Sequence, residues 1–330
     1  MRTGICLGLL ASLVTYATPS FAIYNGIADS DSVIKGTKIA TPGTHLYAGL
    51  LYYPGVVNGA NKYLTCGATL VDSTEIPAEF KRRIAITAGH CIRGFNDDVD
   101  NRDLRVTFIA NPGMVMDTTP PTRAPVALSN VTSKNSFAGH AWTPLLQQIN
   151  GVGPGGYKDD YAVIVLNKDN PVPDYIVPQL MQLPSVGQAG TLIGSQRSLT
   201  LTGYGTIVWG NFNSTPTPTT DWTNQIISGT GAGNILGLRQ KMTVEMKVIS
   251  VNAWNIEESM NFAQGDGTAC NGDSGSGFID TLDPNAPVLL ATVSQGDFNC
   301  RAVNTSTRID TTEFYNFLRS TINKLNLLGK

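Results

Sequence analysis

The chain has 330 residues, of which 42% are hydrophobic, and this supplies enough apolar material for a substantial core. Charged residues make up only 15% and the formal net charge is −2, so the composition argues against a nucleic-acid-binding surface or an acidic tail. Glycine, threonine, valine and asparagine are frequent and long helical periodicities are scarce, which predicts a mostly β fold.

Residues 1–22 have the pattern of a secretory signal peptide. Arg2 gives the positive start, residues 4–17 form the apolar stretch, and Ser20-Phe21-Ala22 is a small-x-small cleavage site. A membrane anchor is the alternative, but the stretch is shorter than the roughly 20 residues that a spanning helix needs. We therefore expect a secreted protein, extracellular or periplasmic in a Gram-negative bacterium, with no membrane span in the mature chain.

Short apolar or alternating runs predict the strands. They are found at residues 47–53, 64–71, 83–87, 161–166 and 199–206. Residues 111–156 and 211–233 are rich in Pro, Gly, Ser, Thr and Asn, which predicts long surface loops. A G-x-G-x-x-G run at 151–156 lies in the first of these loops, and we assign it no nucleotide, because no strand precedes it.

The C-terminal segment has a different periodicity. Asp310 and Glu313 have capping-box spacing. Apolar residues then recur at helical spacing, at Phe314, Phe317, Leu318, Ile322, Leu325 and Leu328. These patterns predict a terminal amphipathic helix over about 311–328, with its apolar face packed on the core.

Three separated motifs carry chemistry. They are Thr87-Ala88-Gly89-His90-Cys91, the run Asp159-Asp160 followed by an apolar strand at 161–166, and Asn271-Gly272-Asp273-Ser274-Gly275. A serine hydroxyl is a weak nucleophile that needs a base to take its proton and a third group to orient that base. Glycines beside the serine let backbone N–H groups approach the atom it attacks.

The order His, Asp, Ser with these flanks resembles the chymotrypsin/trypsin-like serine proteases. That resemblance implies two six-stranded antiparallel β-barrels followed by a C-terminal α-helix. The resemblance covers Ile23 to about Leu328 and implies a protease domain at 23–330, with a first barrel at about 23–185 and a second at about 186–308. His90 and Asp160 are 160 − 90 = 70 residues apart, which is longer than this family usually shows and indicates an insertion.

The resemblance also implies the catalytic roles. Ser274 is the nucleophile, His90 the base, and Asp160 the residue that orients the base. We prefer Asp160 to Asp159 because Asp160 directly precedes the predicted strand. The N–H groups of Gly272 and Ser274 form the oxyanion hole. The implied reaction is hydrolysis of peptide bonds through an acyl-enzyme on Ser274.

Five cysteines are present, and Cys6 lies in the signal peptide. The other four suit an oxidising compartment and allow three disulfide connectivities. The resemblance implies the pairs Cys66–Cys91 and Cys270–Cys300. Zinc is the alternative use, but the chain has no C-x-x-C spacing and only three histidines, so we expect no metal and no cofactor.

Signal cleavage after Ala22 would expose Ile23, which is similar to the start of activated family members. The resemblance implies that this amino group pairs with Asp273, so that signal removal activates the enzyme. Tyr24 and Asn25 depart from the family's usual residues, and cleavage after Ala17 would instead leave a propeptide starting at Thr18.

The register from Ser274 implies a substrate pocket formed by Thr268, Gly296 and Asn304. None of the three is acidic, which argues against a preference for Lys or Arg unless Asp266 or Asp297 enters the pocket. We therefore expect small or medium uncharged side chains. The expected partners are protein or peptide substrates and proteinaceous inhibitors, and we expect a monomer.

A different class of function also fits a chain of this kind. A secreted binding protein on a catalytically weak protease scaffold would carry its function in the long loops, because fold does not fix function. The complete set of His90, Asp160 and Ser274 argues against that reading. Ester hydrolysis without peptide hydrolysis would use the same site.

Overall fold

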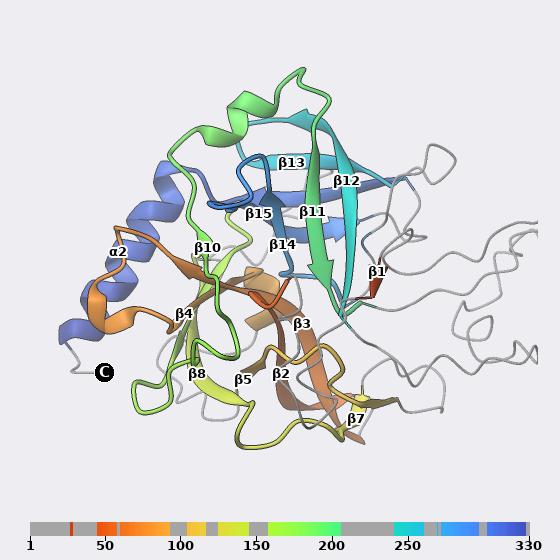
Figure 1. Ribbon diagram of the computed structural model, residues 1–330, viewed down its shortest axis with the longest axis vertical. Coiled ribbons are helices and arrows are strands. Elements are labelled where there is room, and N and C mark those ends of the chain that lie inside the picture. The colour runs from red at the N-terminus through yellow and green to blue at the C-terminus, as the bar shows by residue number, and fades with distance from the viewer. Residues whose placement is uncertain are drawn as a thin grey trace, which may run out of the picture.

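The computed structural model describes residues 27–28, 45–57, 60–92, 104–116, 125–144, 158–205, 241–260, 269, 272–296 and 302–327. Within these ranges the protein consists mainly of antiparallel β-strands, and a helix lies near the C-terminus. The predicted mostly β class and the terminal helix are therefore confirmed. Figure 1 shows two groups of strands, with the helix at their side.

Six strands close into an antiparallel barrel. Each strand pairs with the next in the order given, and the last pairs with the first. The strands are β11 (Ser198–Gly203), β12 (Met242–Val251), β13 (Asn255–Ser259), β16 (Val303–Arg308), β15 (Val288–Gly296) and β14 (Gly277–Asp280). Apolar side chains such as Leu201, Met246, Ile256 and Phe278 fill its core, because alternate residues of a strand point to the same face.

A second group of six strands pairs antiparallel in the order β2, β3, β4, β9, β8 and β5, and β5 pairs with β2. The bounds are β2 (Ala48–Val57), β3 (Ala60–Asp72), β4 (Ile84–Thr87), β9 (Ala162–Leu166), β8 (Phe137–Trp142) and β5 (Arg105–Thr107). The strands predicted at residues 47–53, 64–71, 83–87 and 161–166 all lie in this group, which occupies the lower part of Figure 1.

The predicted surface loop at residues 111–156 is partly wrong. It contains β8, which pairs with β5 on one edge and with β9 on the other. Gly139 interrupts the apolar pattern of this strand, and a Cβ atom there would lie 2.8 Å from the Val165 carbonyl oxygen. The close approach of β9 therefore requires glycine, and this residue hid the strand from a periodicity argument.

Short elements join and flank the two groups. The strand β10 (Met181–Gln182) pairs in parallel with both β3 and β15 and so links the groups. Further pairings are made by β1 (Ile27–Ala28) with β12 and by β6 (Met114–Met116) with β7 (Pro125–Leu128). Three 3₁₀ turns are present among the described residues, η2 (Ala78–Phe80), η3 (Gly89–Ile92) and η5 (Gln188–Leu192).

The helix α2 (Thr312–Leu327) packs its apolar face on the group that contains β9. The Phe314 ring meets the Tyr161 ring edge to face, with 5.2 Å between the ring centroids. Leu318, Ile322 and Leu325 are buried in the same cluster. The predicted core-packing role of this helix is therefore confirmed, and the C-terminal segment covers strands from the first half of the chain.

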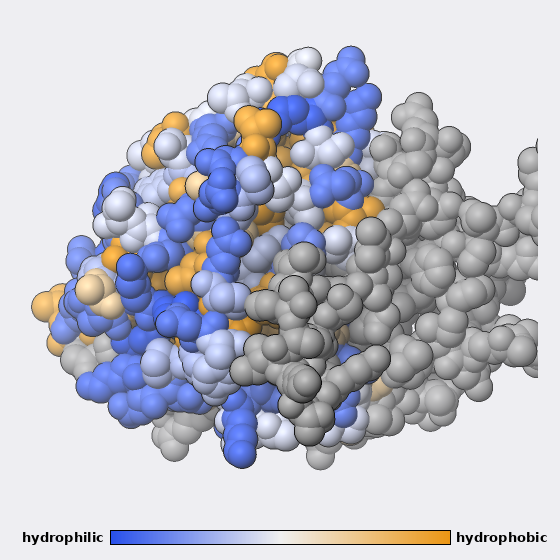
Figure 2. All heavy atoms as spheres, viewed as in Figure 1, coloured by the Kyte–Doolittle hydropathy of each residue, from blue (hydrophilic) through white to orange (hydrophobic). Residues whose placement is uncertain are grey.

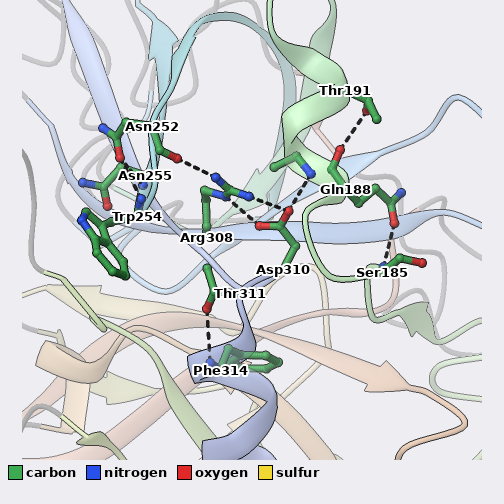
Figure 3. A network of polar contacts seen from close by, with 11 residues as sticks. Ser185, Gln188, Thr191, Asn252, Trp254, Asn255, Arg308, Asp310, Thr311 and Phe314 are labelled. Carbon is green, nitrogen blue, oxygen red and sulfur yellow. Dashed lines mark hydrogen bonds and ion pairs between the residues drawn. The ribbon is translucent and has the colours of Figure 1, made fainter.

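The predicted capping box of Asp310 and Glu313 is wrong. Thr311 provides the cap, since its Oγ1 accepts a hydrogen bond from the Phe314 N–H at 3.2 Å (Figure 3). The Asp310 carboxylate instead accepts hydrogen bonds from the Arg308 guanidinium, at 2.7 Å from Nε and 2.9 Å from Nη2. It also accepts one from the Ala189 N–H at 2.6 Å. Asp310 therefore ties the end of β16 to the turn η5.

We expect Asp310→Ala to lower the free energy of unfolding by about 3 kcal/mol, because it removes the carboxylate that pairs with Arg308 in a largely buried setting. Glu313→Ala is the matched control, since Glu313 is exposed and contributes only through the helix dipole, at less than about 1 kcal/mol. Urea unfolding measures both values. Equal losses of unfolding free energy in the two variants would contradict the inference that Asp310 stabilises the fold by joining β16 to η5.

The face shown in Figure 2 is mainly hydrophilic where it is described, and its hydrophobic residues are scattered rather than gathered in one patch. The large hydrophobic side chains that are exposed, among them Tyr175, Ile193 and Leu282, belong to separate segments of the chain. Among the described residues, no helix combines the length and the apolar character needed to cross a membrane.

Candidate active site

His90 lies in η3, directly after the end of β4. A disulfide joins the next residue, Cys91, to Cys66 on β3, with 6.2 Å between the Cα atoms, so the predicted pair Cys66–Cys91 is confirmed. The Tyr53 hydroxyl donates a hydrogen bond to the Cys91 carbonyl oxygen at 2.6 Å. The histidine turn is therefore fixed covalently and by hydrogen bonding to neighbouring strands. The other predicted pair, Cys270–Cys300, lies outside the described residues.

Asp160 precedes β9 and is fully buried. Its Oδ2 lies 2.8 Å from His90 Nδ1, and its Oδ1 accepts a hydrogen bond from the His90 backbone N–H at 2.7 Å. A carboxylate that accepts the Nδ1 proton leaves Nε2 as the basic nitrogen of a neutral imidazole. Asp159 has a left-handed backbone with φ of 62°, and burial raises the pKa of its carboxyl.

Ser294, on β15, adds a third hydrogen bond to this carboxylate. Its hydroxyl donates to Asp160 Oδ2 at 2.5 Å, although the two residues are 134 positions apart. Both partners are buried. The sequence did not predict this contact, because no local pattern around Ser294 indicates it. The contact connects the barrel to the acid that orients His90.

Ser274 lies in a turn that is held by backbone contacts on both sides. The Gly67 N–H donates to the Ser274 carbonyl oxygen at 2.7 Å, and the Gly275 N–H donates to the Val293 carbonyl oxygen at 2.8 Å. Gly275 has φ of 78°, and a Cβ atom there would lie 2.8 Å from the backbone nitrogen of Ala88. Only glycine fits this position, and the fit brings the Ser274 turn against the segment that leads into His90.

The structure thus brings the three predicted catalytic residues into one region from three distant segments. Ser274 and His90 are partly exposed, with 25% of the His90 side chain accessible, whereas Asp160 is fully buried. No protein-family model matches the chain, and no curated protein matches it. A histidine that is oriented by a buried acid can act as the general base that activates a partly exposed serine as a nucleophile.

Asp273, which precedes the serine, is fully buried. Its Oδ1 accepts a hydrogen bond from the Gly205 N–H at 2.7 Å. Cβ atoms at Gly203 and Gly205 would lie 2.2 and 2.1 Å from its carboxylate oxygens, so both positions require glycine. Gly272, a predicted oxyanion-hole residue, has a left-handed φ of 98°. The predicted partner of Asp273, Ile23, lies outside the described residues.

Two of the three predicted pocket residues are described, and they are neighbours. Gly296 at the end of β15 is the direct partner of Asn304 on β16. Gly296 lies two residues beyond Ser294, so this pair adjoins the strand segment that contacts Asp160. Thr268 lies outside the described residues, as do Asp266 and Asp297.

Among the described residues, one cluster has the composition of a metal site, Cys66, His90 and Cys91. The two sulfur atoms are joined in the disulfide and so are not thiolate ligands. The other two histidines lie elsewhere, with His45 Nδ1 2.9 Å from the Tyr47 hydroxyl and the His140 ring beside Trp142. These contacts support no metal site at the candidate centre.

Proposed function

We propose that the protein is a secreted serine endopeptidase with Ser274, His90 and Asp160 as its catalytic residues. The observation that carries the proposal is the pair of hydrogen bonds from His90 to the buried Asp160. The Ser274 turn, packed against the same histidine segment, supplies the third group. A buried carboxylate that accepts hydrogen bonds from both the backbone N–H and the ring of one histidine orients that histidine as a general base.

In the proposed reaction the Ser274 hydroxyl attacks the scissile carbonyl carbon while His90 Nε2 takes its proton. Asp160 stays ionised and stabilises the imidazolium that forms. The N–H groups of Gly272 and Ser274 bind the oxyanion, which develops only as the tetrahedral intermediate forms. His90 then gives its proton to the leaving amine, and water hydrolyses the acyl-enzyme by the reverse sequence.

The proposal extends to the architecture. We interpret the group of β2, β3, β4, β9, β8 and β5 as a first barrel, so that the fold is a chymotrypsin-like pair of barrels. On this interpretation His90 and Asp160 come from the first barrel, and Ser274 and Ser294 come from the second. Assembly of the site then depends on contact between the two barrels. The hydrogen bond from Ser294 of the second barrel to Asp160 of the first is one such contact.

Peptide-bond cleavage tests the proposal. The purified protein is incubated with a denatured protein substrate, and mass spectrometry maps the new amino termini. We expect internal cleavage that a fluorophosphonate abolishes, because an activated serine attacks its phosphorus, displaces fluoride and is phosphonylated irreversibly. Folded protein that hydrolyses activated esters but no peptide bond would instead indicate an esterase. Protein without either activity would favour a binding protein on this scaffold.

A further inference from the structure

Lys158 lies two residues before the candidate catalytic acid and contacts a distant part of the chain. Its side chain is exposed, and its Nζ lies 4.0 Å from the centroid of the Trp254 ring. Trp254 belongs to the turn between β12 and β13, so this contact joins the segment that leads into β9 to the six-stranded barrel. An ammonium group over an indole ring is attracted by the negative face of the ring. The proposed chemistry uses neither residue.

Trp254 is held in place by hydrogen bonds within the barrel. Asn252 Oδ1 accepts hydrogen bonds from the backbone N–H groups of Trp254 and Asn255, both at 2.8 Å (Figure 3). The Arg308 backbone N–H donates to the Trp254 carbonyl oxygen at 2.9 Å, and Arg308 Nη1 donates to the Asn252 carbonyl oxygen at 2.6 Å. Arg308 is itself paired with Asp310. The turn that presents the indole ring to Lys158 therefore has a fixed backbone.

The three residues from Lys158 to Asp160 are attached to the barrel at both ends. At the C-terminal end, Asp160 accepts the hydrogen bond from Ser294. At the N-terminal end, Lys158 contacts Trp254. Between them Asp159 has φ of 62°, a left-handed conformation that is less favourable than the helical or extended ones for a residue with a Cβ atom. Such a residue keeps its conformation where its surroundings hold it. The Lys158 contact therefore restrains the backbone directly before the acid.

We propose that Lys158 and Trp254 are positioning residues for the catalytic acid, Asp160. The inference rests on the proposed peptidase function. The two residues act through the Asp160 carboxylate, whose Oδ2 lies 2.8 Å from His90 Nδ1. A hydrogen bond weakens steeply as its angle departs from linear, so a small displacement of the carboxylate reduces its control of the imidazole. A small misplacement of a catalytic group lowers the reaction rate even when the fold is intact.

The residue that follows the acid is fixed independently of Lys158. The Thr143 hydroxyl donates a hydrogen bond to the Tyr161 carbonyl oxygen at 2.8 Å, and the Tyr161 ring packs against Phe314 of α2. Both contacts remain when the Lys158 side chain is changed. Because Lys158 is also exposed, its substitution should leave the free energy of unfolding nearly unchanged. The expected effect is therefore on the catalytic rate rather than on folding.

The kinetic test compares Lys158→Met, which removes the charge, with Lys158→Arg, which keeps a cation that can lie over the ring. We expect Lys158→Met and Trp254→Leu each to lower kcat by about fivefold with KM unchanged, and Lys158→Arg to keep the native kcat. The double variant should lose no more than either single variant, because both remove the same contact. Lys168→Met is the matched control, since Lys168 is an exposed lysine beyond the other end of β9, and it should keep the native kcat.

The Nδ1 proton of His90 provides a readout that does not depend on turnover. Its NMR resonance, identified by its loss in His90→Gln, should broaden through exchange with water in Lys158→Met and stay sharp in Lys158→Arg and Lys168→Met. An unchanged resonance or an unchanged kcat in Lys158→Met would overturn the inference, and a fluorophosphonate adduct on Ser274 would then leave the peptidase function standing. Absence of that adduct in the native protein would overturn the peptidase function, and the resonance would still decide whether Lys158 positions Asp160.

Discussion

Ser274→Ala should reduce peptide hydrolysis by about 10⁶-fold, which is the size of the loss in an unrelated protease that uses the same three groups. The methyl group of alanine cannot form an acyl-enzyme, so only the uncatalysed attack of water assisted by binding remains. The measurement is kcat on a cleavable peptide, with KM expected to change little, because the hydroxyl acts in the transition state rather than in substrate binding.

Ser276→Ala is the matched control for this prediction. Ser276 lies in the same turn, and its hydroxyl is buried and has no hydrogen-bond partner among the described residues. Removing an unsatisfied hydroxyl costs the fold little. We expect activity within about threefold of the native value. Comparable losses at Ser274 and Ser276 would mean that the turn is only structurally sensitive and would contradict the role of Ser274.

Asp160→Asn should lower kcat by about 10⁴-fold with little change in the fold. The carboxylate accepts the His90 Nδ1 proton, whereas an amide nitrogen in its place would donate to Nδ1. The imidazole proton would then lie on Nε2, and His90 could no longer take the Ser274 proton. The reaction rate and a thermal unfolding midpoint on the same samples distinguish this loss of tautomer control from unfolding.

Asp159→Asn provides the comparison for this substitution. Asp159 has φ of 62°, a conformation that asparagine tolerates well, so the change should not strain the backbone. We expect near-native activity. The pair of variants also tests the choice between two adjacent acids. A larger loss at Asp159 than at Asp160 would show that the hydrogen bonds to His90 do not identify the catalytic acid.

The sequence predicted the strands that have short apolar or alternating runs. Strand β9 is buried along its whole length, and β4 likewise, so their composition alone indicates them. Strand β8 was missed because Gly139 and His140 break its pattern, although packing against β9 requires the glycine. The helix predicted at about 311–328 is found at Thr312–Leu327, but its capping residues were misassigned. Asp310 has the chemistry of a cap, but tertiary contacts with Arg308 and Ala189 occupy it.

The candidate site could be predicted only where local motifs encode it. His90, Asp160 and Ser274 each lie in a short run with recognisable neighbours, whereas Ser294 does not. Its contact with Asp160 depends on strand register, and the register shifts between Val293 and Gln295 in the pairing of β15 with β16. A shift of one residue turns every later side chain to the opposite face, and the residue types do not reveal it.

Covalent labelling of the nucleophile tests the central claim most directly. The folded protein is treated with a fluorophosphonate probe, and the adduct is located by mass spectrometry. An activated serine is predicted to give a single adduct on Ser274. The rate of labelling should fall sharply in Asp160→Asn, and no adduct should form when the protein is unfolded. Folded protein that gives no adduct, or that is labelled equally at Ser276, would contradict the assignment of a catalytic serine.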